Sequence, residues 1–393
     1  MNGADRVGPR IRALAALVGA ALVAAPLAAQ DSTAAPPDRA PWRTNYFPYL
    51  IGNPATGLML VAHLDHFRQA DYFARVPNDA FVAVDAGISA QGSRFLIGRF
   101  RAPQLVNGWR FAVDAGASRE SRFGYSGFLP TDSMPEHNED RVHRTRYLVK
   151  AEVTRKISGP LAIAAMAGVE RTRWSRLPGT TAFAADYGDD QVETGGVGRV
   201  SLVLDVRDRE FLTGKGLLAE AGLLIGGGGE DRDGDVVSRG AYGGWYAHLR
   251  GYVSPRSGTL LAARLAARSL GETATLQARN TLPGWEGDVD ALGGPHAHRS
   301  FLPGRMAGRG LLLGSFEVRH NLLDVGDYGA VTAIGFLDGG RTFEEDFSFT
   351  TSGWKVGGGG GVALRVLRSS LLVFNFAGGP AGFSFSMGTG WAF

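Results

Sequence analysis

The chain has 393 residues with 41 basic and 38 acidic side chains, a net charge of +3, and no cysteine. The absence of cysteine excludes disulfides, thiolate metal sites and cysteine nucleophiles, and the near balance of charge gives no indication of nucleic-acid binding. No run of 18 apolar residues occurs, so membrane-spanning helices are not expected.

The first residues of the chain resemble a secretory signal. Three arginines among the first 12 residues are followed by the short apolar stretch Ala13–Ala25 and by small residues that offer a cleavage site near Ala29. An apolar stretch of about 13 residues falls short of the roughly 20 needed to span a bilayer. We therefore expect a signal peptide at 1–29, a disordered leader at 30–43 that is too short for a periplasmic domain, and one barrel domain at 44–393.

Period-two alternation of apolar and polar residues runs through almost all of the remaining chain, and helical periodicity is nearly absent. The sixteen expected strands cover residues 44–52, 56–67, 80–90, 92–102, 107–118, 144–157, 160–176, 195–208, 215–226, 240–253, 257–271, 310–322, 327–338, 353–367, 370–378 and 381–393. Each is long enough to cross a membrane at a tilt.

The lengths of the connections support an outer-membrane barrel, in which long loops face outward and short turns face the periplasm. Long connections are expected at 119–143, 177–194, 227–239, 272–309 and 339–352, and they alternate with short turns such as Ser158-Gly159 and Arg368-Ser369. Two connections break this rule, the short outer loop Pro54–Ala55 and the long inner segment 68–79.

Charged residues recur on one face of many expected strands. They include Arg199, Asp205, Arg207, Arg264, Arg268, Glu317 and Arg319. Charged side chains on one face suit a polar, water-filled lumen. In lipid every backbone polar group must be paired within the protein, so the sheet has to close into a barrel. The sequence thus predicts an all-β transmembrane antiparallel β-barrel of about 16 strands in the bacterial outer membrane, surrounded by outer-membrane lipid.

The last expected strand is aromatic on one face and small or polar on the other. The first face carries Phe383, Phe385, Met387, Thr389, Trp391 and Phe393. We expect this face to contact lipid. The strand also resembles the C-terminal signal by which the barrel assembly machinery recognises barrels for insertion, which makes its aromatic residues and Met387 candidate recognition residues.

Two groups of side chains are of types that bind metals. Alternation places His66 on the face opposite His63 and Asp65, so these side chains do not converge. The acidic run Glu230–Asp235 lacks the EF-hand spacing, so a solvated acidic loop is expected. The histidines of the loop 272–309 are expected to be polar loop groups, and neither a metal nor another cofactor is expected. No G-x-S-x-G motif occurs, and no enzyme activity is expected.

Several stretches resemble the outer-membrane assembly-protein superfamily of BamA/TamA-type barrels, also called bacterial surface antigen barrels. The matching stretches are Leu204–Asp208 with Phe211–Gly216, Leu292–Gly294, Arg299–Phe301, Arg305 with Gly308, Phe316–Arg319 and Phe336–Gly340. Leu212 stands where the family usually has proline, and Ser300 stands where it has glycine.

The resemblance implies that the sixth outer loop, 272–309, folds into the lumen. It also implies that Arg299, in the segment Arg299-Ser300-Phe301, is held there by Glu317 and Asp338. A guanidinium has five fixed donors and can bridge two carboxylates. We call this expected set the loop lock. The glycine run Gly357–Gly361 lacks the features of a phosphate-binding loop, and we expect it to mark a bend or the close approach of the inserted loop.

By resemblance, the function is non-enzymatic insertion or translocation of protein or lipid through a seam between the first and last strands. Pro48, Gly388 and Gly390 weaken pairing at that seam. Because periplasmic domains are not expected, an unknown periplasmic partner would capture the client. The alternative is a passive pore that prefers anions because arginines line its lumen.

Overall fold

A computed structural model describes residues 40–69, 74–127, 140–179, 182–232, 235–344, 347, 349, 352–366 and 370–393. The expected signal peptide, residues 30–39 of the expected leader and the expected turn at Arg368-Ser369 lie outside these residues.

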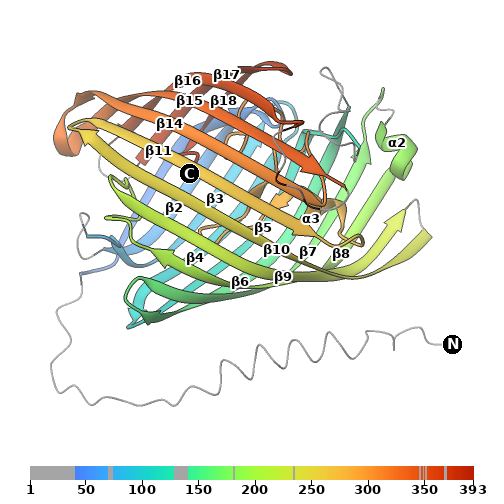
Figure 1. The fold of residues 1–393 in the computed structure, drawn as a ribbon, viewed down its shortest axis with the longest axis horizontal. Helices are drawn as coiled ribbons and strands as arrows, with labels where there is room; N and C mark the ends of the chain where they lie inside the picture. The colour runs from blue at the N-terminus through green and yellow to red at the C-terminus, as the bar shows by residue number, and fades with distance from the viewer. Residues whose placement is uncertain are drawn as a thin grey trace, which may run out of the picture. The chain divides into compact units, whose positions relative to one another are not determined.

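The described residues form a closed antiparallel barrel of sixteen strands, each paired with its neighbour in the chain (Figure 1). The strands are β1 Arg43–Asn53, β2 Gly57–Gln69, β3 Asn78–Ser89, β4 Arg94–Val106, β5 Trp109–Gly124, β6 Arg141–Ser158, β7 Leu161–Arg176, β8 Asp190–Asp205, β9 Gly216–Arg232, β10 Asp235–Arg256, β11 Thr259–Leu270, β14 Gly310–Asp324, β15 Gly329–Phe343, β16 Lys355–Val366, β17 Ser370–Gly379 and β18 Gly382–Thr389. The predicted fold class and strand number are confirmed.

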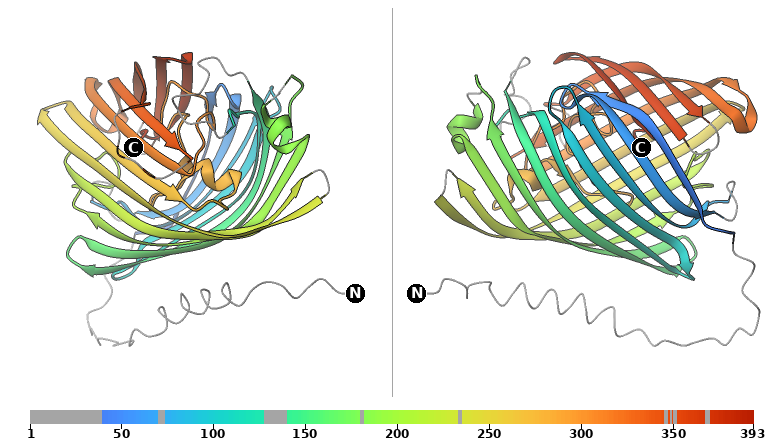
Figure 2. Two further views of the ribbon diagram at one scale, coloured as in Figure 1. Left: turned by 45° about the vertical axis from the view of Figure 1, so that its right-hand side comes forward. Right: turned by 180° about the vertical axis from the view of Figure 1, so that it is seen from behind.

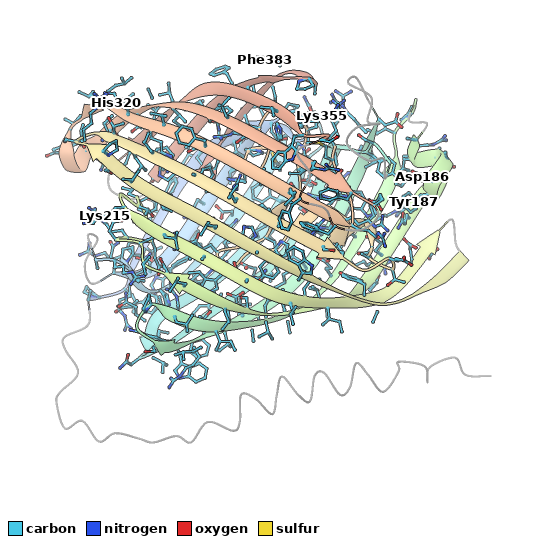
Figure 3. All side chains as sticks on the ribbon, viewed as in Figure 1. Asp186, Tyr187, Lys215, His320, Lys355 and Phe383 are labelled. Carbon is cyan, nitrogen blue, oxygen red and sulfur yellow. The ribbon has the colours of Figure 1, made fainter. Side chains whose placement is uncertain are left out.

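Alternation along each strand separates an outer apolar face from an inner polar one. On β14, Phe316 is 43% exposed on the outside, whereas Glu317 and Arg319 are buried on the inside. Exposed apolar side chains on other strands include Ile88, Val169, Leu202, Leu223, Leu265, Leu337 and Phe383. Phe383 projects outward in Figure 3. Such a face matches hydrocarbon, as the alternation predicts.

The two ends of the barrel differ in their connections (Figure 2). At the short-turn end, labelled by Lys215 and His320 in Figure 3, most neighbouring strands are joined by a few residues, as at 107–108 and 257–258. At the long-loop end, labelled by Asp186 and Tyr187, the connections carry their own elements. These are α2 Ala182–Tyr187 and, in the loop 271–309, α3 Leu276–Arg279, β12 Thr281–Leu282 and β13 Val289–Asp290. No helix in the described part of the chain combines the length and apolarity needed to cross a membrane.

Four expected loops are shorter than the sequence suggests. Those at 119–143 and 177–194 lose residues to the neighbouring strands, since β5 runs to Gly124, β6 starts at Arg141 and β8 starts at Asp190. The expected loop at 339–352 begins only after Phe343, and the one at 227–239 is largely strand, since β9 runs to Arg232 and β10 starts at Asp235. The glycines that indicated a loop in β9 instead allow close strand contact: a Cβ on Gly228 would lie 2.0 Å from the Thr194 oxygen. The expected solvated acidic run is also wrong at Glu230, which is buried and accepts a hydrogen bond from Gln191. Asp233 lies outside the described residues.

The expected last strand, 381–393, is wrong over its final residues. β18 ends at Thr389, and Gly390 has a φ of +81°, in the left-handed region that favours glycine. After this turn Trp391 and Phe393 pack against lumen-facing arginines rather than lipid. Phe383, Phe385 and Met387 stay in the strand. The alternation of apolar and polar residues does not reveal this turn, because a single glycine in the left-handed conformation changes the direction of the chain for all residues that follow it.

Candidate functional site

Arg299 lies inside the barrel, between two acids of neighbouring strands. Its Nε and Nη2 donate to the two carboxylate oxygens of Asp338 on β15, each at 2.8 Å, and its backbone N–H donates to Asp338 at 3.0 Å. Its Nη1 donates to Glu317 on β14. The guanidinium also lies over the Phe336 ring, with 3.6 Å from Cζ to the ring centroid. All three charged side chains are 1% exposed, so the structure brings together the residues expected to form the loop lock.

The residues after Arg299 pack against β16 and the inner wall. Ser300 Oγ shares a hydrogen bond of 3.1 Å with His298 Nδ1, and His298 Nε2 lies 2.9 Å from the Lys355 carbonyl oxygen. Phe301 is buried in an apolar cluster with Leu292, Met306 and Leu311, among others. A Cβ on Gly357 would lie 2.2 Å from Ser300 Oγ. The expectation that a glycine of the run in β16 accommodates the loop is therefore confirmed at Gly357.

Replacing Gly357 with alanine should destabilise the barrel by about 1–3 kcal/mol, the usual cost of overpacking. The added methyl would meet Ser300 Oγ at 2.2 Å and Cβ at 2.7 Å. Adding Ser300→Gly should restore most of the loss, because it removes both atoms. The matched control is Gly335→Ala on β15, where an added Cβ meets nothing within 4 Å. Thermal unfolding in detergent measures all four proteins, and equal midpoints for the two alanine variants would contradict the prediction.

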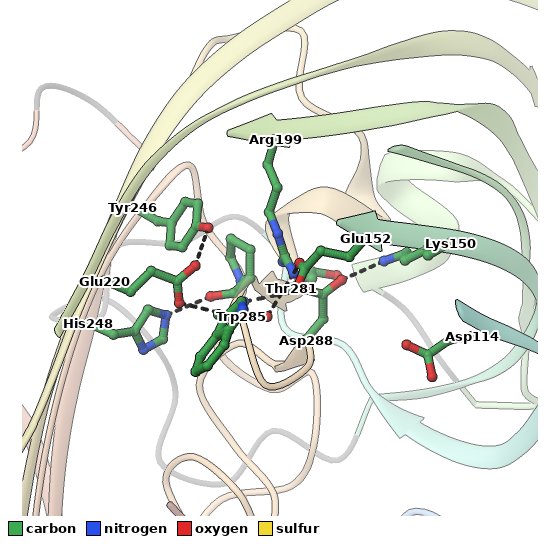
Figure 4. A network of polar contacts seen from close by, with 12 residues as sticks. Asp114, Lys150, Glu152, Arg199, Glu220, Tyr246, His248, Thr281, Trp285 and Asp288 are labelled. Atoms are coloured by element: carbon green, nitrogen blue, oxygen red, sulfur yellow. Dashed lines mark hydrogen bonds and ion pairs between the residues drawn. The ribbon is translucent and has the colours of Figure 1, made fainter. Parts of the chain in front are cut away.

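A second part of the same loop is anchored on the other side of the lumen, at β6 and β8 (Figure 4). Asp288 accepts from Lys150 Nζ at 2.5 Å and from Arg199 Nη1 at 2.6 Å, and Arg199 also donates to Glu152 at 2.6 Å. These cations hold the pKa of the Asp288 carboxyl well below its usual range, against the opposing effect of burial. Asp288 is therefore ionised at neutral pH and ties the loop to this wall.

Neighbouring loop residues extend the second anchor. Glu286 accepts from Arg207 at 2.7 Å and Arg250 at 2.5 Å, and Asp290 accepts from Arg144 at 2.9 Å. Trp285 is held through its backbone N–H, which donates to Glu220 at 2.8 Å, and its indole, which donates to Thr154 at 2.9 Å. Figure 4 shows Trp285 pointing toward Glu220 and His248 on adjacent strands.

This second anchor was not predicted from the sequence. Glu286, Asp288 and Asp290 are the acids of the loop between Thr273 and Arg309, and they alternate, as the lumen arginines do. A requirement that buried arginines find carboxylates would have pointed to them. Within this loop, the resemblance to the family implied an anchoring role only for Arg299.

The arginines that suggested an anion pore are occupied by contacts within the chain. Arg199 and Arg207 bind loop acids, and Arg264 donates to the His296 carbonyl oxygen at 2.7 Å. Arg268 donates to the Ala278 carbonyl oxygen at 2.8 Å, and to other loop carbonyls. Arg319 donates to Glu317 at 2.7 Å. These side chains hold the loop and the inner wall together, so they do not provide the free charges that the pore hypothesis assumed.

The expected inner turn after β8 is capped by Asp208. Its carboxylate accepts from the backbone N–H groups of Arg209 at 2.9 Å and Gly214 at 3.0 Å. Leu212, which replaces the family's proline, has a φ of +55°. Proline is fixed near −65° and cannot adopt this value, so the substitution goes with a different turn conformation.

The histidines on β2 separate as alternation predicts. His63 faces the lumen, where its Nδ1 lies 2.7 Å from Asp85, and Asp85 also accepts from Tyr49 at 3.0 Å and Arg99 at 2.5 Å. His66 instead stacks on Trp42 with ring centroids 4.9 Å apart. Within the described ranges no three acids or histidines are grouped as metal ligands.

The pairing between β1 and β18 is the weakest in the barrel wall. β1 pairs with β2 along its whole length, from Arg43 to Asn53. With β18, the described residues give one register pair, Gly52 with Met387. β18 then ends two residues later, at Thr389. This junction, which we call the seam, leaves most of one edge of β1 without a partner strand in the described chain.

No protein-family model matches the sequence, and no curated protein matches it. The fold is similar to that of BamA from Haemophilus ducreyi lacking POTRA domains 1–3, with a TM-score of 0.52, 11% identity, and coverage of 89% of this chain and 70% of that one. CdiB from Escherichia coli gives a TM-score of 0.55 at 14% identity, covering 90% and 63% of the two chains. CdiB from Acinetobacter baumannii gives 0.50 at 12%, covering 88% and 59%.

The chain therefore spans less than two thirds of either CdiB chain. At these identities the likeness concerns the fold: the chain is a BamA- and CdiB-type barrel of sixteen strands in its described part. A closed barrel of this kind with an apolar outer face is an outer-membrane architecture.

Proposed function

We propose that this outer-membrane barrel inserts or translocates protein or lipid through the seam between β1 and β18, without enzymatic catalysis. The observation that carries the proposal is the pairing of the seam at one register position in the described residues, against full-length pairing of β1 with β2. The fold shared with BamA and CdiB supports the same function.

The free edge of β1 offers a template for a client strand. An unpaired strand edge presents backbone N–H and C=O groups that readily pair with another extended chain. Pro48, near the middle of this edge, lacks an N–H donor, which lowers the stability of a closed seam. A client strand would pair with β1 and enter the bilayer at the seam, where opening the barrel wall requires little free energy.

The position of the loop 271–309 favours a route for the client through the barrel wall rather than along the lumen. The loop is anchored on β14 and β15 by Arg299 and on β6 and β8 by Asp288, so it bridges the lumen. A freely conducting pore would require both anchors to break. In this proposal the outer face contacts outer-membrane lipid, the assembly machinery inserts the barrel itself, and a periplasmic partner delivers the client at the short-turn end.

A disulfide across the seam should abolish the activity. Extending the register from Gly52 and Met387 by two residues places Leu50 opposite Thr389, and both side chains are exposed on the outer face. Because the chain has no cysteine, Leu50→Cys with Thr389→Cys gives one defined pair. The readout is the rate at which a urea-unfolded outer-membrane barrel folds into vesicles that contain the protein. The protein should accelerate this folding. Oxidation of the cysteine pair should remove the acceleration, and reduction of the disulfide should restore it.

The matched control shares one cysteine. Leu372 pairs with Thr389 between β17 and β18, so Leu372→Cys with Thr389→Cys places a disulfide inside the wall and leaves the seam free. Acceleration that survives oxidation of the seam pair, or that is lost equally with the control pair, would overturn the seam mechanism. Large, steady anion-selective conductance in planar bilayers would instead support the passive pore.

A further inference from the structure

Four arginines project from the outer face of the barrel wall, on the strands β4, β5 and β7. They are Arg94, Arg119, Arg171 and Arg173, and we call them the arginine patch. Alternation places them on the outer face, because they have the same parity along their strands as exposed apolar side chains such as Leu96, Val113 and Val169. Charged side chains on this face are unusual, since the alternation elsewhere directs charge into the lumen.

The arginine patch is compact because its members meet in the strand register. Arg94 pairs directly with Arg119. Arg119 pairs with Thr145 on β6, and Thr145 pairs with Arg173. Neighbouring strands lie about 4.8 Å apart, so the patch spans about 14 Å from β4 to β7. Arg171 lies one outward position further along β7. One large headgroup can therefore contact all four guanidinium groups.

The acids of these strands do not neutralise the arginine patch, because alternation turns them toward the lumen. Glu120 of β5 binds Arg144 inside the barrel. Glu170 of β7 binds Arg146 there at 2.6 Å. Among the residues that the structure describes, only Asp190 forms an ion pair with a member of the patch. Four arginines and one aspartate leave the outer face with a local net charge of +3.

The patch also carries two unfavourable features that an anion would offset. Arg94 and Arg119 stand directly opposite each other, and like charges in this position destabilise a strand pair. In the described chain the buried Arg119 Nε has no hydrogen-bond partner, although buried donors normally have one. Arg171 donates to the Thr194 hydroxyl at 3.2 Å but pairs with no described acid. Donors and positive charge are thus available to an external acceptor.

The patch lies at the long-loop end of the barrel, where the apolar outer belt ends. The next outward positions toward the short-turn end are large and apolar or aromatic: Leu96, Tyr147 and Val169 are 56%, 55% and 62% exposed. The long loops of outer-membrane barrels face outward. An arginine on the lipid face is strongly unfavourable at the bilayer midplane and nearly neutral at its surface. The patch is therefore at the level of the outer-leaflet headgroups.

We propose that the arginine patch binds the anionic, phosphorylated headgroup of an outer-leaflet lipid, whose acyl chains lie along the apolar belt beside it. Guanidinium groups bind phosphate through paired, charge-assisted hydrogen bonds. The belt continues directly from the patch, so the surface fits an amphiphile better than free phosphate. The patch shares no residue with the seam or with the lumen anchors. The inference therefore goes beyond the proposed function and does not depend on it.

The test titrates the full chain in detergent with diphosphorylated lipid A and measures bound lipid by native mass spectrometry. The wild-type chain should bind lipid A about tenfold more tightly than Arg94→Gln with Arg119→Gln, because that variant loses charge-assisted hydrogen bonds. The matched control, Arg155→Gln with Lys156→Gln, removes two exposed charges from the short-turn end of β6 and should bind like the wild-type chain. Phosphatidylcholine, whose headgroup has no net charge, should not distinguish the three proteins.

Equal lipid A affinity of the wild-type chain and the Arg94 and Arg119 variant would overturn the proposal, as would an equal loss in the control. Excess inorganic phosphate should leave lipid A bound, and displacement would show a phosphate site instead of a lipid site. Heat-modifiability on gels checks that each variant folds. If the double variant does not fold, Arg171→Gln changes one exposed side chain, and unchanged lipid A affinity in that variant would refute the site.

Discussion

Replacing Arg299 with alanine should destabilise the barrel by about 3–5 kcal/mol, the usual cost of removing one partner from a buried ion pair. The reason is that Glu317 and Asp338, each 1% exposed, would keep their charges without a compensating donor. The loop would also lose the bonds that order it on β14 and β15. Heat-modifiability on gels and protease resistance of the loop 271–309 measure the two effects.

Two variants separate this explanation from a general effect of losing an arginine. Arg173 forms an ion pair with Asp190 at 2.8 Å but is 61% exposed, so Arg173→Ala should cost no more than about 1 kcal/mol. Adding Asp338→Asn to Arg299→Ala should recover part of the loss, because it removes one buried uncompensated charge. Unchanged heat-modifiability and loop protection in Arg299→Ala would refute the loop lock.

The strands could be predicted because the membrane imposes one simple rule on them. Each lipid-facing position must be apolar and each lumen position tolerates charge, so Phe316, Glu317 and Val318 already reveal both faces of β14. The glycine-rich end of β9 could not be predicted as a strand in this way, because glycine has no side chain and so shows no alternation of apolar and polar residues. Its pairing with β8 depends on backbone contact that the sequence does not display.

The candidate site was predicted only where the family resemblance implied the partners of a residue. The resemblance to BamA/TamA-type barrels paired Arg299 with Glu317 and Asp338, and the structure brings these three side chains together. Trp391 and Phe393 continue the alternation of β18 without a break, so nothing in the pattern favours the lumen over lipid. The turn at Gly390 and the lumen-facing arginines decide their position, and the contacts with these arginines join distant parts of the chain.

The two anchors act on different parts of one loop, which has consequences for its stability. Arg299 binds β14 and β15, whereas Asp288 binds β6 and β8, so each anchor shortens the free segment that the other must order. Ordering a long segment costs conformational entropy for every residue fixed. Breaking one anchor should therefore release only part of the loop, and breaking both should open the lumen.

Replacing Asp288 with alanine should cost about 3–5 kcal/mol, because Lys150 and Arg199 would remain buried with one carboxylate fewer. In planar bilayers each single variant, Asp288→Ala or Arg299→Ala, should show brief conductance steps, and the double variant should show large, sustained ones. Conductance of the double variant equal to that of the wild-type chain would contradict the view that the loop closes the lumen through these two anchors.

The pH dependence of this anchor follows from the lowered pKa of Asp288. Its contribution to stability is fully present above the ordinary aspartate pKa of about 3.9 and is lost as the pH falls toward the lowered value in the folded chain. Asp288→Asn keeps the shape of the side chain and removes its titration. The difference in unfolding midpoint between the wild-type chain and Asp288→Asn should thus be large at about pH 7 and shrink by about pH 2.5. A difference that stays constant over this range would show that the carboxylate charge does not hold the loop.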